Sequence, residues 1–181
     1  MTQWQFDPAH SNADFAVRHM MVSTVRGGFK QVTGVLNFDP DNPADSYVEA
    51  AIKADSIWTG VADRDGHLRS PDFLDVANYP EITFKSARVE VISNTEAKVY
   101  GDLTIRGATR PSTLDVEFLG EGKDPFRQRT VLGFSATARI NREDFGLTWN
   151  QALETGGVLV GKEVKISLDV EVVPVAEAVA V

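Results

Sequence analysis

Residues 97–106 read AKVYGDLTIR, and this stretch sets the pattern that decides the fold. Apolar or small residues stand at the odd positions, while Lys98, Asp102 and Arg106 stand at even positions. Successive side chains of a β-strand point to opposite faces, so a period of two indicates a strand with one face buried and the other in water. The stretch therefore predicts an amphipathic strand.

The same alternation recurs before and after this stretch. It covers residues 13–19, 48–54, 82–86, 114–118, 132–140 and 164–172, and two less regular segments lie at 4–7 and 29–38. Turn-forming pairs such as Ser93-Asn94 and Arg106-Gly107 separate the runs. Because links this short suit antiparallel pairing, we predict an all-β chain of about eight antiparallel strands. We expect one domain that spans residues 1–181.

Three stretches depart from the alternation. In residues 62–78, Ser70 suits a helix N-cap and Pro71 suits the first helical position, so we expect one or two short helices there. Residues 141–150 form a second irregular stretch that is expected to carry a helical turn. The apolar tail, residues 172–181, contains Pro174, and we interpret it as a frayed end after the last strand.

The predicted strands can close into a barrel or stack as a sandwich. Their inward stripes include small residues that leave volume to be filled, namely Ala50, Ala54, Ala97, Gly101, Ala136 and Ala138. In a barrel a ligand can occupy this volume. Alternatively, the aromatic side chains of Phe15, Phe84, Phe118 and Phe134 can fill it. The pattern leaves both alternatives open.

The composition limits the possible partners and compartments. A net charge of -8 makes the chain a poor binder of nucleic acid or anionic membranes by electrostatics alone. The absence of cysteine removes disulfides, thiolate nucleophiles and cysteine-based metal sites. No apolar run approaches the ~20 residues of a transmembrane helix. Residues 1–7 carry neither the basic nor the apolar region of a signal peptide, so we expect a cytoplasmic protein.

The polar clusters do not predict a catalytic or metal site. His10, Asp14 and His19 could suggest metal ligands, but positions 14 and 19 face opposite sides of an alternating strand. Asp63-Arg64-Asp65 with His67 could suggest acid–base chemistry, yet a solvated loop and helix start explain them better. No nucleophile elbow, phosphate-binding loop, dinucleotide fingerprint or zinc-protease motif is present. We therefore expect no enzyme, no cofactor and no metal.

A series of short motifs resembles the YceI-like family of polyisoprenoid-binding proteins. The motifs are Asp7-Pro8-x-His10-Ser11, Phe15-x-Val17-x-His19, Val25-Arg26-Gly27-x-Phe29, Ser56-Ile57-x-Thr59-Gly60, Arg64-Asp65-x-His67-Leu68-x-Ser70-x-Asp72-Phe73-Leu74-Asp75, Tyr79-Pro80-x-Ile82-x-Phe84, Gly101-x-Leu103-Thr104-Ile105-Arg106-Gly107 and Ile140-x-Arg142-x-Asp144-Phe145-Gly146. No single motif is diagnostic. Their shared order over nearly the whole chain makes the resemblance specific.

The resemblance implies a lipocalin-like, eight-stranded antiparallel barrel. Its long apolar cavity would take an isoprenoid lipid, such as a polyprenyl phosphate or an isoprenoid quinone, for binding, transport or storage without catalysis. It also implies a homodimer. Many family members carry a signal peptide, and this chain departs from that pattern. Two other functions remain possible: an enzyme acting on such a lipid, with titratable groups converging at the cavity mouth, or a barrel filled by side chains.

Strand parity predicts which side chains would contact the lipid. The expected lining set is Phe15, Val17, Ala50, Ile52, Phe84, Val99, Leu103, Val116, Phe118, Phe134, Ala136, Ile166 and Leu168. His19 shares this parity near a strand end, so it is a candidate contact for the head group. Arg142 and Trp149 could approach the head group from the second irregular stretch, and an arginine suits a phosphate through bidentate hydrogen bonds.

Overall fold

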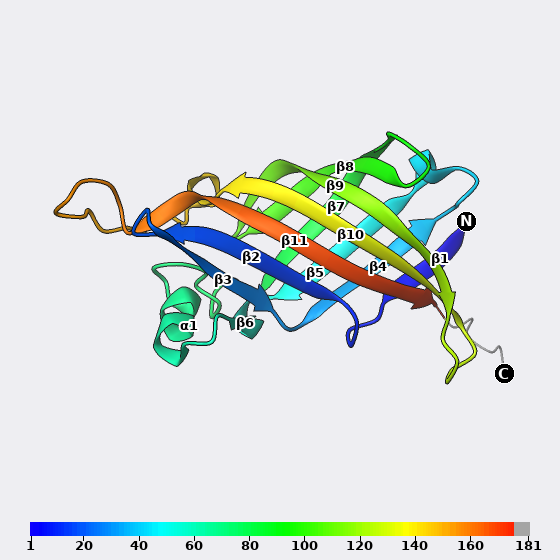
Figure 1. Ribbon diagram of the computed structural model, residues 1–181, viewed down its shortest axis with the longest axis horizontal. Helices are drawn as coiled ribbons and strands as arrows, with labels where there is room; N and C mark the ends of the chain where they lie inside the picture. Colours follow the sequence, from blue (N-terminus) through cyan, green and yellow to red (C-terminus); the bar gives the residue numbers. More distant parts are fainter. Residues whose placement is uncertain (176–181) are drawn as a thin grey trace.

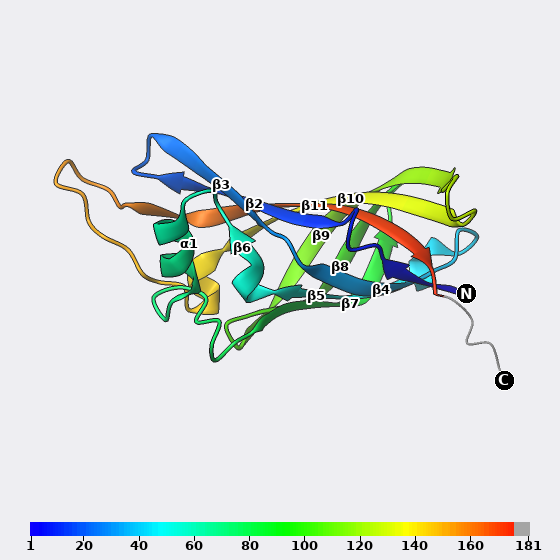
Figure 2. The same cartoon turned by 90° about the horizontal axis from the view of Figure 1, so that it is seen from below.

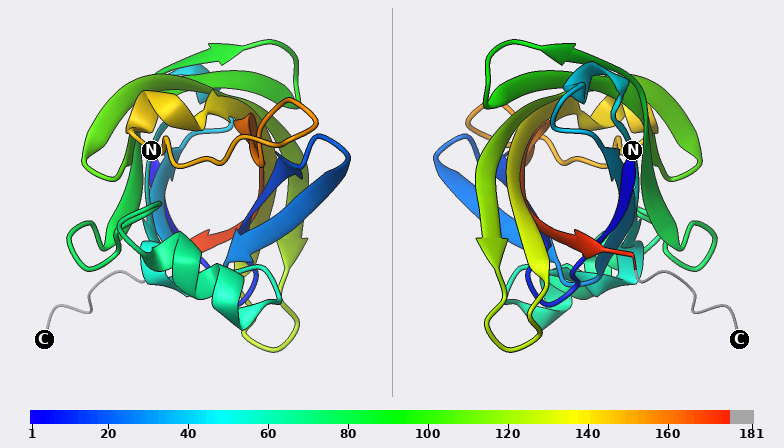
Figure 3. Two further views of the ribbon diagram at one scale, coloured as in Figure 1. Left: turned by 90° about the vertical axis from the view of Figure 1, so that its left-hand side faces the viewer. Right: turned by 90° about the vertical axis from the view of Figure 1, so that its right-hand side faces the viewer.

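The computed structural model describes residues 1–175, which form an eleven-stranded sheet wrapped around one axis (Figures 1 and 3). Eight strands pair as a closed antiparallel ring: β1 (Thr2–Phe6), β4 (Val32–Phe38), β5 (Tyr47–Lys53), β7 (Glu81–Val91), β8 (Glu96–Ile105), β9 (Ala108–Lys123), β10 (Thr130–Asn141) and β11 (Val160–Pro174). The pairing of β1 with β11 closes the ring. The predicted all-β, eight-stranded antiparallel barrel is confirmed.

Strand β11 is the strand at which the barrel closes. One edge pairs with β10, and the other edge pairs first with β2 (Asn12–His19) and then with β1. From β2 the chain continues into β3 (Ser23–Phe29), which pairs with β6 (Ile57–Trp58). These three strands extend the sheet at one end of the barrel, where helix α1 (Ala62–Arg69) also lies (Figures 1 and 2). We call this the α1 end.

The structure corrects two expectations about strands. β3 was not predicted, because Gly27 and Gly28 interrupt its alternation. At the other terminus, Val172 and Val173 belong to β11 rather than to a frayed tail, and they are 0% and 2% exposed. They are buried because β11 lies between β10 and β1 here, with Val172 opposite both Leu132 and Phe6. The rest of the predicted tail, residues 176–181, lies outside the described residues.

The helical segments are short, and their boundaries differ from the prediction. Helix α1 ends before Ser70, which is its C-cap rather than an N-cap. Pro71 explains this stop, because a proline disfavours the helical conformation of the residue before it. Three 3₁₀ helices complete the described part of the chain: η1 (Pro43–Asp45), η2 (Ala54–Ser56) and η3 (Arg142–Phe145). η3 confirms the helical turn predicted within residues 141–150. No helix within residues 1–175 is long and apolar enough to cross a membrane.

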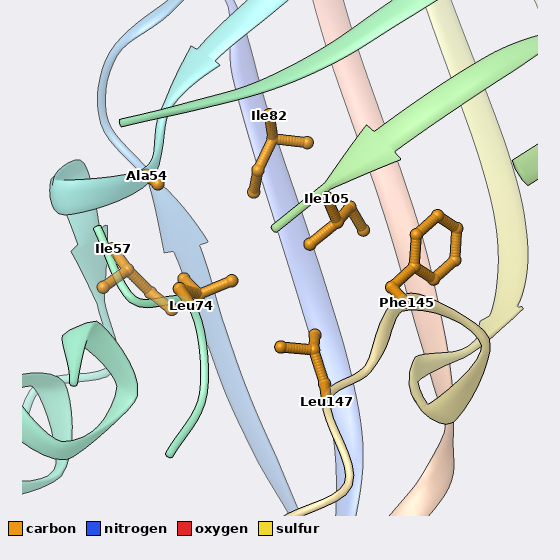
Figure 4. Packing of buried hydrophobic residues seen from close by; sticks show 7 residues of the cluster. All are labelled: Ala54, Ile57, Leu74, Ile82, Ile105, Phe145 and Leu147. Atoms are coloured by element: carbon orange, nitrogen blue, oxygen red, sulfur yellow. The ribbon is translucent and has the colours of Figure 1, made fainter. Parts of the chain in front are cut away.

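Apolar side chains pack at both ends of the barrel. At the α1 end, one cluster joins η2, β6, η3 and the neighbouring ends of β7 and β8, and its side chains converge in Figure 4: Ala54, Ile57, Leu74, Ile82, Ile105, Phe145 and Leu147. At the opposite end, Trp4, Phe38, Leu132 and Val172 form a second cluster. Between the clusters, the inner faces of the strands surround the cavity described next.

Candidate ligand-binding cavity

A cavity of about 420 Å³ lies inside the barrel and is lined mainly by apolar side chains. At the α1 end its lining includes the buried side chains of Phe73, Leu74 and Leu147. At the opposite end it includes exposed residues of the β4–β5 connection and the β7–β8 turn, such as Pro40 and Asn94. The cavity therefore extends along the barrel and reaches solvent between these connections. Its volume lies in the range of small-molecule sites, which is roughly 300–1,000 Å³.

The strand register explains how the cavity is lined. Ala50, Phe84 and Leu103 lie side by side across β5, β7 and β8. Fourteen of the sixteen side chains predicted to contact a ligand are in the lining: Phe15, Val17, Ala50, Ile52, Phe84, Val99, Leu103, Val116, Phe118, Phe134, Ala136, Arg142, Ile166 and Leu168. That these side chains contact a ligand stays a prediction.

Small residues create the open volume, but aromatic rings fill part of it. Four of the predicted small positions line the cavity, namely Ala50, Ala97, Ala136 and Ala138. Gly101 does not, because the Phe84 ring lies over it: a Cβ on Gly101 would stand 2.6 Å from Cζ of Phe84. The rings of Phe118 and Phe134 also pack together, with centroids 5.2 Å apart. The volume left by small residues is therefore open at some levels of the barrel and filled by aromatic side chains at others.

Arg142 brings a buried guanidinium to the α1 end of the cavity. The residue is 3% exposed, and it donates hydrogen bonds to the backbone carbonyls of Gly161 (2.7 Å), Leu147 (2.5 Å) and Val160 (3.2 Å). Burial lowers the pKa of Arg142 from its ordinary value, although the neighbouring Glu143 acts in the opposite direction. Within the described residues Arg142 forms no ion pair. Its three bonds leave some of the five guanidinium N–H donors unused.

The other two predicted head-group contacts lie outside the cavity lining. His19 has the same strand parity as Val17, but it is not in the lining. The pairing of β2 with β11 is irregular here, because β11 has a register shift between Val160 and Val164. Strand parity therefore does not predict the lining at His19. Trp149 instead packs edge-on against His67, with ring centroids 4.7 Å apart. This geometry gives no support to His19 or Trp149 as direct ligand contacts.

A charged cluster that the sequence did not predict joins β1 to the β9–β10 connection. Arg129 donates to the carboxylate of Asp7 at 2.9 Å, and His10 lies 3.5 Å from Asp7 and 3.9 Å from Glu171. Burial would raise the pKa of Asp7, but hydrogen bonds from the Ala9 amide and His10, with the charge of Arg129, hold that pKa below its usual value. The distances among Asp7, His10 and Glu171 would suit a metal ion, yet Arg129 already supplies the compensating positive charge.

The polar residues weighed as acid–base groups serve the local fold. The Asp65 carboxylate is buried and accepts hydrogen bonds from the backbone amide of Thr59 (2.9 Å) and from the Thr59 hydroxyl (2.5 Å). His67 pairs with Asp72 at 2.9 Å. None of these side chains is in the cavity lining, whereas the neighbouring apolar residues Leu68 and Phe73 are. The α1 segment therefore contributes apolar surface to the cavity.

Comparisons with known proteins agree with this architecture. A UPF0312 protein of Staphylococcus epidermidis is 43% identical over 171 residues, which cover 94% of this chain and 97% of the relative. BcnA of Burkholderia cenocepacia has a similar structure, with a TM-score of 0.80 at 23% identity over 92% of this chain and 98% of BcnA. A polyisoprenoid binding domain from Saccharophagus degradans shares the fold, with a TM-score of 0.66 at 14% identity over 97% of this chain and 100% of that domain. The YceI-like domain family matches residues 4–172, and the chain therefore belongs to the YceI-like family.

Proposed function

We propose that this protein binds an isoprenoid lipid in the barrel cavity, for transport or storage, and does not transform it. The observation that carries the proposal is the apolar cavity of about 420 Å³, which extends along the barrel from the packed α1 end to the solvent opening at the opposite end. Membership of the YceI-like family and the shared fold with a polyisoprenoid binding domain support the same ligand class.

Hydrophobic burial supplies the binding energy for such a ligand. Enclosing apolar surface stabilises a complex by roughly 25 cal/mol per Å². An apolar cavity that extends along the barrel discriminates by chain length rather than by polar contacts. A polyprenyl phosphate or an isoprenoid quinone would place its chain along the lining strands. Arg142 is the predicted contact for the polar head group, because its guanidinium lies at the cavity wall and retains unused N–H donors.

The distribution of titratable groups favours binding over catalysis. Asp14, Glu96 and Arg142 are the charged residues of the described lining, and they come from strands or turns at different places around the barrel. An enzyme would need an acid, a base or a nucleophile within hydrogen-bond reach of one another at the reacting atoms. The expected cytoplasmic location and homodimer remain predictions.

Native mass spectrometry of the purified protein, with the variant Ala136→Phe, tests the proposal. We expect a co-purified lipid of isoprenoid mass in the parent protein. Ala136 lies on β10 between Val116 and Leu168 and lines the cavity, so a phenylalanine there should occupy ligand volume and sharply reduce lipid uptake. After the lipid is stripped, the thermal stability of Ala136→Phe should be nearly unchanged, because the ring enters open volume.

A matched substitution on the outer surface separates cavity blocking from a general effect of phenylalanine. Ala87 is exposed in β7 and outside the lining, so Ala87→Phe should retain the lipid. Strong destabilisation of stripped Ala136→Phe, together with full lipid uptake by the folded fraction, would contradict a cavity at this level. Filling a solid core in this way costs typically about 1–3 kcal/mol.

A further inference from the structure

An apolar tip projects from the α1 end of the barrel. It consists of Met20, Met21 and Val22 in the β2–β3 turn, which are 45%, 64% and 80% exposed. The chain segment 148–159 projects beside this turn, and the two are joined by a hydrogen bond from the Met20 amide to the Leu159 carbonyl at 2.8 Å (Figure 1). The apolar side chains are thus held by ordered backbone near the α1 extremity of the molecule, where segment 148–159 projects farther out than the turn itself (Figures 1 and 2).

Neither the turn nor packing accounts for Met20 and Val22. Met20 and Met21 have φ angles of +51° and +63°, a conformation for which asparagine and glycine are the preferred residues in tight hairpin turns. Met21 packs against Gly157 of the neighbouring segment, but Met20 and Val22 remain largely in solvent. Consecutive exposed apolar side chains on a strained turn are typical of an interaction surface.

The charges beside the tip identify the kind of partner. Residues 15–30 contain no acidic residue in a chain whose net charge is -8, and Arg18 is the cation nearest to the tip in sequence. Arg26 and Lys30 lie farther along the hairpin, with Lys30 over the Trp58 ring, and the neighbouring segment 148–159 contributes one acidic residue, Glu154. Arg18 is exposed and stands two residues before Met20, which places it about 7 Å below the tip at the rise of a β-strand. Side chains of a protein bound at a bilayer surface enter it by about 5–10 Å, so Arg18 would lie at the depth of the lipid phosphates.

The tip lies close in sequence to the α1 end of the cavity. Val17 on β2 lines the cavity and stands three positions before Met20. Val160 on β11 also lines the cavity and directly follows Leu159, which is hydrogen-bonded to Met20. Contact between the tip and a bilayer would therefore hold the α1 end of the cavity against the membrane surface.

We propose that the apolar tip docks on a lipid bilayer, with Met20 and Val22 in the interface and Arg18 against lipid phosphates. The proposal goes beyond the lipid bound in the cavity and uses different side chains, so it can fail or hold independently of the proposed function.

Sedimentation with phosphatidylcholine vesicles, with and without phosphatidylglycerol, tests the docking surface. We expect the protein to bind vesicles, and to bind more strongly when phosphatidylglycerol is present at low salt. The double variant Met20→Asn/Val22→Ser keeps the Met21 contact and places a better-suited residue at the positive φ. Its thermal stability should be unchanged or higher, while its vesicle partition coefficient should fall roughly tenfold or more. Arg18→Gln should lose the preference for phosphatidylglycerol and its dependence on salt.

Phe126 provides the matched control, because it is 95% exposed in the β9–β10 connection at the opposite end of the barrel. Phe126→Ser should bind vesicles as the parent protein does. Equal vesicle binding by the parent and Met20→Asn/Val22→Ser would overturn the proposal, as would loss of binding in Phe126→Ser alone. Conversion of a dimer to a monomer by Met20→Asn/Val22→Ser without vesicles would also overturn it, because a second copy would then cover the tip. If that variant does not fold, an unchanged lipid preference in Arg18→Gln overturns the proposal.

Discussion

Arg142 places a positive charge inside a cavity that is otherwise mainly apolar. The carbonyls of Gly161, Leu147 and Val160 surround its guanidinium and hold η3 against the start of β11. Removing the side chain would take this donor from the Gly161 and Leu147 carbonyls, whereas the Val160 carbonyl would keep the Asn150 side-chain amide at 2.8 Å. Each buried unsatisfied group costs about 1–3 kcal/mol. The role of Arg142 in ligand binding is therefore better tested by changing the ligand's head group than by truncating the arginine.

Asp7 provides a residue-scale prediction about acid stability. Because its pKa is lowered in the folded protein, the stability it contributes is present above the unfolded-state pKa of about 3.9 and is lost as the pH falls through the folded-state value. We expect Asp7→Asn to lower the free energy of unfolding at pH 7 by about 1–3 kcal/mol, since Arg129 and the Ala9 amide lose their charged acceptor. Urea denaturation at pH 7 and below pH 4 measures both effects.

Asp169→Asn is the control for this prediction. Asp169 is exposed on β11 and forms no ion pair within the described residues. Its substitution should leave the free energy of unfolding and its pH dependence nearly unchanged. If acidification destabilises Asp7→Asn as much as it destabilises the parent protein, Asp7 does not contribute to the acid transition.

At the scale of elements, the sequence predicted those strands in which apolar and polar residues alternate without interruption. The stretch 97–106, which falls within β8 and the turn after it, is the clearest example, and Arg106 and Gly107 form that turn with φ angles of +49° and +72°. β3 was not predictable in this way, because its glycines are required by neighbouring chains. A Cβ on Gly27 would lie 2.7 Å from Cζ of Phe15, and one on Gly28 would lie 2.5 Å from Oδ1 of Asp14.

The same limit applies to the candidate site. Parity predicted strand residues that the structure has in the lining, from Phe15 to Leu168, because most of them lie within regular ladders. Phe134 is in the lining although it borders a register shift between β9 and β10. It did not place His19 or Trp149, since an irregular pairing and a loop intervene. The charged cluster at Asp7 could not be predicted from the sequence either, because Arg129 is 122 residues away from Asp7 along the chain. Long-range contacts of this kind have no local signal.

Substituting alanine for either of two glycines in different elements should change the free energy of unfolding in opposite directions. Gly66 lies within helix α1, and a Cβ added there meets nothing within 4 Å. Gly66→Ala should therefore stabilise the protein by about 0.5–1 kcal/mol, because alanine loses less backbone entropy in a helix. Gly101 lies in β8, where an added Cβ would stand 2.3 Å from the Lys85 carbonyl oxygen, so Gly101→Ala should destabilise by about 1–3 kcal/mol. Thermal or urea denaturation of both variants measures the difference, and changes of equal sign would contradict it.

At the scale of the whole molecule, the closed ring determines what the cavity can hold. Each of the eight barrel strands pairs with a neighbour on both sides, so the ring has no free edge. The inner face is therefore removed from water, and its apolar side chains face one another. The packed cluster at the α1 end limits the open volume on one side, and the solvent opening marks its limit on the other. The barrel therefore sets a maximum length for an enclosed chain.

This limit predicts how affinity depends on the length of the isoprenoid. A burial energy of about 0.8 kcal/mol per CH₂ is an upper estimate for each added carbon, so each further isoprene unit that enters the cavity should raise the affinity by about tenfold or more. Once the chain fills the cavity of about 420 Å³, additional units remain in solvent and the affinity should level off. Calorimetry, or the ligand-induced rise in thermal midpoint, measures this dependence of affinity on chain length, with stripped protein and prenyl alcohols of increasing length.

Prenyl phosphates of the same lengths serve as the comparison. A constant gain in affinity over the alcohols indicates a head-group contact, for which Arg142 is the candidate. An affinity that does not change with chain length would show that the chain lies outside the barrel, and the proposed function would then fail.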